Sequence, residues 1–448
     1  MKAVQVLSFY FVAALAARDS IQNDLTLGTC RSPLLPLSFL ELTDPICSTA
    51  DVIAQKQAAA GGRHVTDESS PWTSISNCAR NGTGPTEFCV FHAGGFANNR
   101  GVSIITSPER AKSLAKLPAF TDPELTADIN KDLDPNYEPV YKSVMVPGKG
   151  VGLVAARTLY RGDRIMSSTP AIVIDYGFFD TMPRKVIKEV QAAAVDILPD
   201  QHRQLLLNLS THDGIHDSYQ QKVDKILSTN AFDIDADPEG DNDDQFYVVF
   251  PEISRSNHDC RPNADYYYDP DTLTQHVHAV RQINIGEEIT LSYLDPMQSQ
   301  ASRLERLSRT WGFPCGCSMC TQKDLIAEES DSRLEQIGEL RKEFHDYTPS
   351  SRATPQMAEL MVSLYQQERL DLMLYEAFTY AAIEYNGVGE PWLATKYARL
   401  AVEYGLASVG PKDNDVVEMD NLVMDPFKHW SWMLRTSKRM SWGKKRDN

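Results

Sequence analysis

The chain has 448 residues, of which 42% are hydrophobic and 23% charged, and its formal net charge at pH 7 is −17. This length is enough for two to three domains with a buried core, and the apolar fraction is ordinary for a globular protein. The acidic balance disfavours non-specific nucleic-acid binding, so we expect no direct contact with nucleic acid and a better match to a basic partner.

The first 17 residues have the form of a secretory signal peptide. Met1 and Lys2 precede an apolar run over residues 6–17 that is broken only by Ser8, and small residues stand in an A-x-A arrangement before Arg18. Such a run is too short to remain as a membrane-spanning helix, so we expect cleavage and no stable membrane anchor. An exposed or amphipathic N-terminal helix is the alternative interpretation.

Cysteine usage divides the chain into two groups of four. Cys30, Cys47, Cys78 and Cys89 precede residue 90, and the other group lies after residue 259. Behind a signal peptide, the first group predicts two disulfides, most simply Cys30–Cys47 and Cys78–Cys89, although four cysteines allow three pairings. Four free thiols in a reducing compartment are the alternative. Asn81 begins an N-glycosylation sequon, which matters only if the chain is secreted.

The other end of the chain favours a different compartment. Residues 435–448 form a basic tail, which is typical of a nuclear address or of a solvated terminus. The signal-like start predicts the secretory pathway or the extracellular space, and the nucleus or cytoplasm is the alternative.

Before residue 140 the sequence predicts little regular structure. Residues 18–90 are interpreted as a loop-rich, cysteine-containing lead. Ser107 and Pro108 are a suitable N-cap and first helical residue for a short helix to about Leu117. Prolines recur over residues 118–147, which predicts an extended connector on the surface. The N-terminal region is therefore assigned to residues 18–139.

Short strands and then helices follow. Alternating and β-branched residues predict strands over residues 141–146, 152–156 and 165–174. The apolar spacing over residues 183–232 changes to the helical period. No cysteine occurs between residues 90 and 259.

The C-terminal third is helical by the same criterion. Long apolar spacing predicts helices over residues 332–346, 355–386 and 391–409. Gly387 and Gly410 are suitable residues for ending two of them. No clean 34-residue period is visible, so true repeats stay unproven.

Four short motifs carry the chemistry, and they occur in a fixed order. They are Gly148-Lys149-Gly150-Val151-Gly152, Asn257-His258-Asp259-Cys260-Arg261-Pro262-Asn263, Gly286-Glu287-Glu288-Ile289-Thr290-Leu291-Ser292-Tyr293 and Cys315-Gly316-Cys317-Ser318-Met319-Cys320. Each motif alone would be ordinary. Together they closely resemble the SET domain of protein lysine methyltransferases, with its NHxCxPN, GEExxxxY and post-SET CxCxxC elements. The resemblance covers roughly residues 140–320.

This resemblance implies the fold class and the domain order. It implies an α+β, β-clip fold of short strands with a pseudoknot over residues 140–295, including a helical insert at about 183–232. A post-SET zinc region over 296–325 and an α-helical, tetratricopeptide-like region over 326–434 would follow, as in SET and MYND proteins. The Cys/His-rich MYND module of those proteins has no counterpart in the insert of this chain.

The implied function is S-adenosylmethionine-dependent methylation of a lysine in a protein, possibly in a basic histone tail. A free lysine has a pKa near 10.4, so the enzyme must receive it in an apolar channel that favours the neutral amine. By resemblance, the catalytic residue is Tyr293, whose hydroxyl orients the reactants; the alternative is an ordinary buried strand tyrosine. We expect the protein to act as a monomer.

The resemblance also assigns the cofactor contacts. An amide side chain, such as that of Asn257, offers donors and an acceptor together and suits the zwitterionic end of the cofactor. A π face, such as that of Phe313, suits a positive sulfonium. The residues implied to contact S-adenosylmethionine are Lys149, Gly150, Val151, Asn230, Asn257, His258, Tyr293 and Phe313.

The second cysteine group predicts a structural zinc site. Its members are Cys260, Cys315, Cys317 and Cys320. Four thiolates complete a tetrahedral zinc shell and leave no open catalytic position. A redox or generic metal motif is the alternative for the last three cysteines alone.

Two other functions stay open at this stage. One is a catalytically weak SET-fold protein that binds zinc and a partner without transferring methyl groups. The other is a methyltransferase for small molecules or secreted proteins, which would apply if the signal peptide is real.

Overall fold

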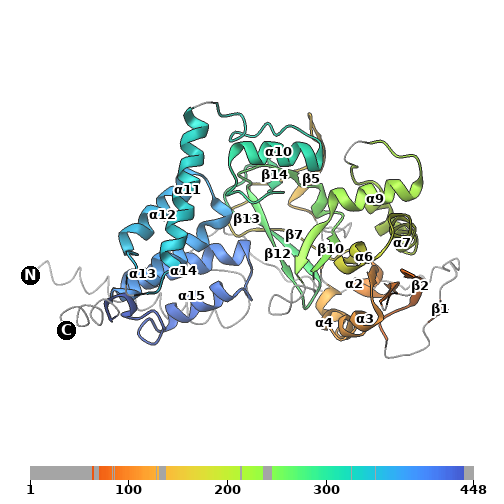
Figure 1. Ribbon diagram of the computed structural model, residues 1–448, viewed down its shortest axis with the longest axis horizontal. Helices are drawn as coiled ribbons and strands as arrows, with labels where there is room; N and C mark the ends of the chain where they lie inside the picture. Colours follow the sequence, from red (N-terminus) through yellow and green to blue (C-terminus); the bar gives the residue numbers. More distant parts are fainter. Residues whose placement is uncertain are drawn as a thin grey trace, which may run out of the picture.

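The computed structural model describes residues 63–64, 70–82, 84, 86–127, 129–130, 138–211, 214–235, 245–323, 325–348 and 350–437. The expected signal peptide, Cys30, Cys47 and residues 438–448 of the basic tail lie outside the described residues. Figure 1 shows the strands of the candidate SET region in the middle, the C-terminal helices on one side and the N-terminal strands and insert helices on the other.

The largest sheet has seven strands in the order β1-β2-β3-β4-β8-β10-β9. Its strands are β1 Arg63–His64, β2 Ser74–Arg80, β3 Glu87–Ala93, β4 Val102–Thr106, β8 Ile172–Asp175, β9 Phe232–Asp235 and β10 Gln245–Val249. β4 pairs parallel with β8, and the other neighbours pair antiparallel. The sheet therefore joins strands from before residue 140 to strands of the SET region.

The expectation of a loop-rich lead was wrong for β2 and β3. Six consecutive residues of β3, from Phe88 to Ala93, are buried, because β3 lies between two other strands and is covered on both faces. Such a strand shows no alternation, and the cysteines were interpreted as loop residues instead. The structure joins Cys78 of β2 to Cys89 of β3 by a disulfide, with Cα atoms 4.0 Å apart. Oxidation of this pair in the cell stays a prediction.

The expected extended connector was also wrong in its first part. Residues 118–127 form two short helices, α4 Pro118–Thr121 and α5 Glu124–Ala127. Pro118 is the first residue of α4, where a missing N–H costs nothing. Phe120 packs on Trp72 with ring centroids 5.2 Å apart, so α4 belongs to the core. The preceding helix is confirmed as α3 Pro108–Leu114, capped by Ser107, and a left-handed turn, α2 Phe96–Asn99, lies before β4.

The helical insert is confirmed. It contains α7 Arg184–Asp196, α8 Asp200–Leu207 and α9 Tyr219–Asn230, and α6 Tyr176–Thr181 precedes it. Its apolar face shares one buried cluster with β3, β4, β8 and β10, and Val195 and Val223 are fully buried in it.

Two smaller sheets form the middle of the molecule. The four-stranded sheet has the order β11-β14-β6-β5, with β5 Tyr141–Val146, β6 Gly150–Ala155, β11 Asn257–His258 and β14 Glu288–Leu291. The three-stranded sheet has the order β12-β13-β7, with β7 Arg164–Ser168, β12 Ala264–Asp269 and β13 Thr274–Ala279. The short strands and the helices make the α+β architecture that the sequence predicts.

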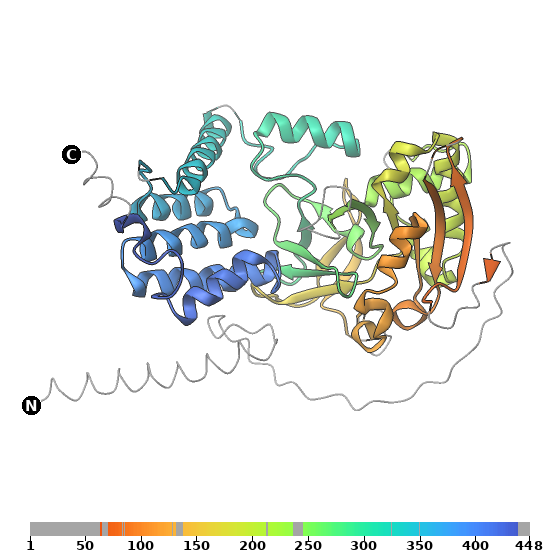
Figure 2. The same cartoon turned by 60° about the horizontal axis from the view of Figure 1, so that its bottom comes forward.

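The C-terminal region is helical, as expected. It contains α11 Leu325–His345, α12 Pro355–Gln367, α13 Leu374–Gly387, α14 Pro391–Ser408 and α15 Asn414–Met424, with a 3₁₀ turn at Asp371–Met373 (η3). A further helix, α10 Gln300–Trp311, lies in the expected post-SET region, and a 3₁₀ turn at Ile253–Arg255 (η2) precedes β11. The single helix expected over residues 355–386 was wrong, because the chain turns between α12 and α13 with Arg369 at φ 52°. Figure 2 shows α11 to α15 stacked at one end of the molecule. Within the described part of the chain, none of the helices has the length and apolar character needed to cross a membrane.

Candidate active site

Two segments that are separated in sequence pair side by side in the four-stranded sheet. Strand β11 lies parallel to β14, with Asn257 opposite Thr290 and His258 opposite Leu291. The Asp259 backbone N–H extends this ladder by donating to the Leu291 carbonyl at 3.0 Å. The NHxC and GEExxxxY motifs are therefore held side by side by backbone hydrogen bonds.

The Asn263 side chain also bonds the backbone of β14. Its Oδ1 accepts a hydrogen bond from the Thr290 N–H at 2.9 Å, and its Nδ2 donates to the Glu288 carbonyl at 2.8 Å. The side chain is buried and takes the place of a neighbouring strand. Its amide satisfies both a donor and an acceptor of β14, which explains why an amide is needed at the last position of NHxCxPN.

Asn257 and Lys149 meet at one carboxylate. Asn257 Nδ2 donates to Glu288 Oε1 at 2.9 Å, and Lys149 Nζ donates to Glu288 Oε2 at 2.7 Å. The structure thus brings together two predicted cofactor residues through Glu288, to which the sequence assigned no role. Glu288 thus neutralises the Lys149 ammonium group with one oxygen and orients the Asn257 amide with the other.

The two glycines of β6 are required for different reasons. Gly150 has φ +78°, a conformation that other residues rarely adopt, and a Cβ there would meet nothing within 4 Å. A Cβ on Gly152 would lie 2.5 Å from Asn257 Nδ2. Gly152 therefore makes room for the Asn257 amide, and Val151 lies half-buried between the two glycines.

His258 connects the predicted catalytic residue to the cysteine cluster. Its Nδ1 lies 3.0 Å from the Tyr293 backbone N–H and so accepts that proton. The proton of the neutral ring is then on Nε2, which lies 3.3 Å from Cys260 Sγ. The His258 ring is therefore already engaged on both nitrogens, and only its backbone remains for the expected cofactor contact.

Tyr293 lies in an aromatic cluster. Its hydroxyl donates to the Ser256 carbonyl at 2.8 Å. Burial, and after it the charge of Glu288, raise the pKa of the Tyr293 hydroxyl, which keeps it protonated at neutral pH. Its ring centroid is 5.2 Å from that of His258 and 5.3 Å from that of Trp311.

Trp311 is a site residue that the sequence reasoning missed. Its indole N–H donates to the Thr229 carbonyl at 3.3 Å, which ties the end of α10 to the end of α9. Phe313 follows two residues later, with its ring 6.3 Å from that of His258. The position of Trp311 two residues before Phe313 was the only sequence signal, and its contact with the end of α9 depends on the fold.

Asn230 lies at the edge of this cluster. It is the last residue of α9, and its Nδ2 donates to the Ile226 and Ser210 carbonyls at 2.7 and 2.8 Å. The Asn230 carbonyl accepts from Ser254, in the turn before the NHxC segment. Both amide protons are thus used within the protein, so a cofactor contact would have to come from its Oδ1 or its backbone.

The four predicted metal ligands meet at one point. The Sγ atoms of Cys260, Cys315, Cys317 and Cys320 all lie within 4.8 Å of one another. Sulfurs at about 2.3 Å from a tetrahedral zinc ion are separated by about 3.8 Å, so these thiols fit such an ion. Cys260 lies just after β11, and the other three cysteines lie in the loop after α10.

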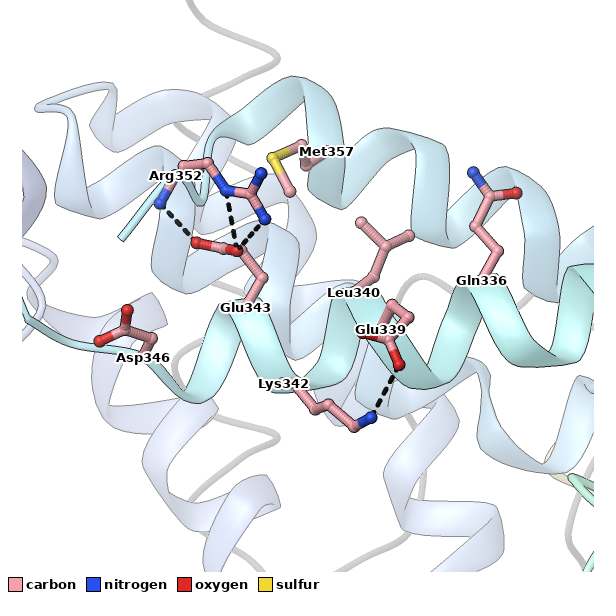
Figure 3. A pocket seen from close by; sticks show the side chains of 8 residues that line it. All are labelled: Gln336, Glu339, Leu340, Lys342, Glu343, Asp346, Arg352 and Met357. Carbon is pink, nitrogen blue, oxygen red and sulfur yellow. Dashed lines mark hydrogen bonds and ion pairs between the residues drawn. The ribbon is translucent and has the colours of Figure 1, made fainter. Parts of the chain in front are cut away.

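A separate cavity lies in the C-terminal region. Figure 3 shows it between α11 and the start of α12, with a volume of about 330 Å³ and Glu343 and Arg352 among its lining residues. The Arg352 guanidinium donates to Glu343 Oε2 at 3.1 Å, so these charges pair with each other. Residues of the aromatic cluster do not line it.

Comparison with known proteins agrees with this geometry. The family model of the SET domain matches residues 150–294. Histone-lysine N-methyltransferase set5 of Schizosaccharomyces pombe is 30% identical over 206 residues, which are 46% of this chain and 58% of that protein. N-lysine methyltransferase SMYD2-B of Danio rerio is 38% identical over 107 residues, or 23% of this chain and 24% of that protein. Histone-lysine N-methyltransferase SMYD3 of Homo sapiens is 35% identical over 80 residues, or 18% of each chain.

Residues 150–294 therefore match the SET domain, and part of the chain is similar to lysine methyltransferases. The match spans 58% of the length of the S. pombe relative and 24% or less of the other two.

Proposed function

We propose that this protein is an S-adenosylmethionine-dependent protein lysine N-methyltransferase. The observation that supports this most is the parallel pairing of β11 and β14, which places Asn257, His258 and Tyr293 together beside Trp311. The names of the relatives support the same reaction class.

Each side chain has a role in this reaction. When bound, the cofactor supplies a methyl group on a sulfonium for in-line displacement. Asn257 would bind the zwitterionic end of the cofactor, and Glu288 would orient the Asn257 amide, which donates to Glu288 Oε1. Tyr293 would orient the reacting groups from a fixed position, because its hydroxyl is anchored on the Ser256 carbonyl.

The substrate amine must lose its proton before it can react. The rings of Tyr293, Trp311 and His258 pack together beside the paired strands β11 and β14. A lysine that enters beside them would lose water, and this desolvation would lower the pKa of its amine. We propose a lysine-bearing protein as the substrate, with a histone tail or a non-histone protein both compatible, and a monomeric enzyme.

The cysteine cluster would hold a structural zinc ion. Cys260, Cys315, Cys317 and Cys320 fit a closed tetrahedral site, which offers no position for a reacting water. Its role would be to fix the loop that carries Phe313 against His258.

Methyl transfer tests the proposal. We expect labelled methyl groups from the cofactor to enter protein in a lysate of the native host, and Tyr293→Phe to lower the rate about a hundredfold or more, since one positioned hydroxyl is lost. Tyr385→Phe is the matched control, because it removes a buried hydroxyl that donates to Glu359, away from the site.

Calorimetry separates this function from a SET-fold scaffold. The Tyr293→Phe protein should bind the cofactor as the wild type does. A wild-type protein that binds no cofactor at millimolar concentration would favour the interaction protein instead. Equal turnover in wild type and Tyr293→Phe would remove Tyr293 from the catalytic role.

We also propose that the protein enters the secretory pathway. The signal-like residues 1–17 and the sequon at Asn81 support this. Cys78 and Cys89 on neighbouring strands are suitably placed for oxidation there. The basic tail favours the nucleus or cytoplasm as the alternative.

A further inference from the structure

A fully buried carboxylate joins the C-terminal helices to the cysteine cluster. Glu368, at the end of α12, has a side chain that is 0% exposed. Its Oε2 accepts from Arg261 Nη2 at 3.1 Å and from Ser330 Oγ at 2.7 Å, and its Oε1 accepts from Arg333 Nε at 2.7 Å. Ser330 and Arg333 belong to α11, whereas Arg261 follows the metal-ligand candidate Cys260. Glu368 thus fixes α11 and the NHxC segment to the same point.

Arg261 bonds the loop of Cys260 and the segment after Tyr293 as well as Glu368. Its Nη1 donates to the Cys260 carbonyl at 2.8 Å and to the Pro296 carbonyl at 3.2 Å, and its Nε donates to the Glu368 carbonyl. Pro296 lies three residues after Tyr293. One planar guanidinium therefore bonds the loop of the first metal-ligand candidate, the segment after Tyr293 and the end of α12.

Further hydrogen bonds connect the same helices to the loop that carries the other three cysteines. Asp331 of α11 accepts from the Gln300 N–H at 3.0 Å, and Gln300 Nε2 donates to the carbonyls of Met319 and Cys320 at 2.9 and 3.3 Å. Arg369 Nη2 donates to Ser318 Oγ at 2.6 Å. The loop segment from Ser318 to Cys320 is thus attached to α11 and to the residue after the α12 C-cap.

We propose that Glu368 is a positioning residue that couples the docking of α11 and α12 to metal retention at the cysteine cluster. The proposal rests on the zinc site proposed above. Without the Glu368 charge, Arg261 would be a buried cation lacking this partner, and the Cys260 loop would lose its anchor. Coupling of this kind is reciprocal, so metal removal should in turn loosen α11 and α12.

The experiment compares zinc release from two full-length variants. Glu368→Gln keeps the shape and removes the charge; Glu384→Gln is the matched control, because Glu384 is equally buried (1% exposed) and paired with Arg435. With a chromophoric chelator in excess, we expect Glu368→Gln to release zinc about tenfold faster or more, as for other groups that orient metal ligands. Glu384→Gln should release zinc at the wild-type rate.

Hydrogen exchange on the wild type gives a second measurement that needs no variant. Chelation should accelerate amide exchange in Leu325–His345 and Pro355–Gln367 more than in Pro391–Ser408, whose Glu403 accepts a hydrogen bond from Arg161 instead. A Glu368→Gln protein that does not fold leaves this comparison as the deciding one.

The outcomes separate the two proposals. Equal release from Glu368→Gln and Glu384→Gln, uniform exchange after chelation, or a wild type without zinc would each overturn the coupling and leave methyl transfer to its own assay. Faster release from Glu368→Gln in a protein without methyl transfer would support the coupling and overturn the enzymatic function.

Discussion

Replacing Gly152 by alanine tests the geometry of the candidate cofactor site directly. The added Cβ would lie 2.5 Å from Asn257 Nδ2, 2.8 Å from Val146 Cγ2 and 3.1 Å from Glu288 Oε1. The first distance is too short for any contact, so the Asn257 amide must move and lose its hydrogen bond to Glu288. A hydrogen bond to a charged group contributes about 1.5–3 kcal/mol. If that bond orients Asn257 for the cofactor, the dissociation constant should rise about tenfold to a hundredfold.

Calorimetric titration of S-adenosylmethionine measures this effect, and a double-mutant cycle assigns it. In an Asn257→Ala background the clash with Nδ2 is gone, so Gly152→Ala should cost at least about 1 kcal/mol less than in the wild type. Gly338→Ala is the control, because a Cβ at that helical position meets nothing within 4 Å. An unchanged dissociation constant in Gly152→Ala, or full additivity in the cycle, would refute the reasoning.

Two further predictions concern metal and compartment. Metal analysis should find one zinc ion per chain, lost in Cys317→Ser, and chelation should lower the melting temperature because the four thiolates bind metal only in the folded state; protein purified without chelators and free of zinc would contradict this. Protein from the native host should begin near Arg18, with Cys78 and Cys89 oxidised and a glycan on Asn81; mass spectrometry that finds an intact Met1 and free thiols would instead place it in the cytosol or nucleus.

The order of the motifs was sufficient to predict the SET region, because the four together are specific although each alone would be ordinary. The meeting of the four cysteines follows from the resemblance, and the insert helices follow from the apolar spacing over residues 183–232. The contact of Asn257 and Lys149 with Glu288 could not be predicted, because it depends on how the three side chains are placed by the folded sheet.

The N-terminal strands were missed for a different reason. β3 and β4 are buried on both faces, so their hydrophobic residues do not alternate and resemble no single secondary structure. β8, the second partner of β4, is parallel to it and lies about seventy residues later, and a pairing over that separation leaves no local signal. Trp311 was missed because its role depends on the end of α9, which only the fold brings near.

The site and the cysteine cluster are one structural unit, and His258 is the reason. Its ring accepts from the Tyr293 backbone on one nitrogen and faces Cys260 Sγ with the other. A thiolate is a stronger acceptor than a thiol, so the ring orientation depends on whether Cys260 is deprotonated, as a metal ligand must be. Under the proposed zinc binding, the position of Tyr293 would be linked to the loading of the metal site, and the Glu368–Arg261 pair would link both to the C-terminal helices. A change in the packing of these helices would then reach the segment after Tyr293 through Arg261 and its hydrogen bond to the Pro296 carbonyl.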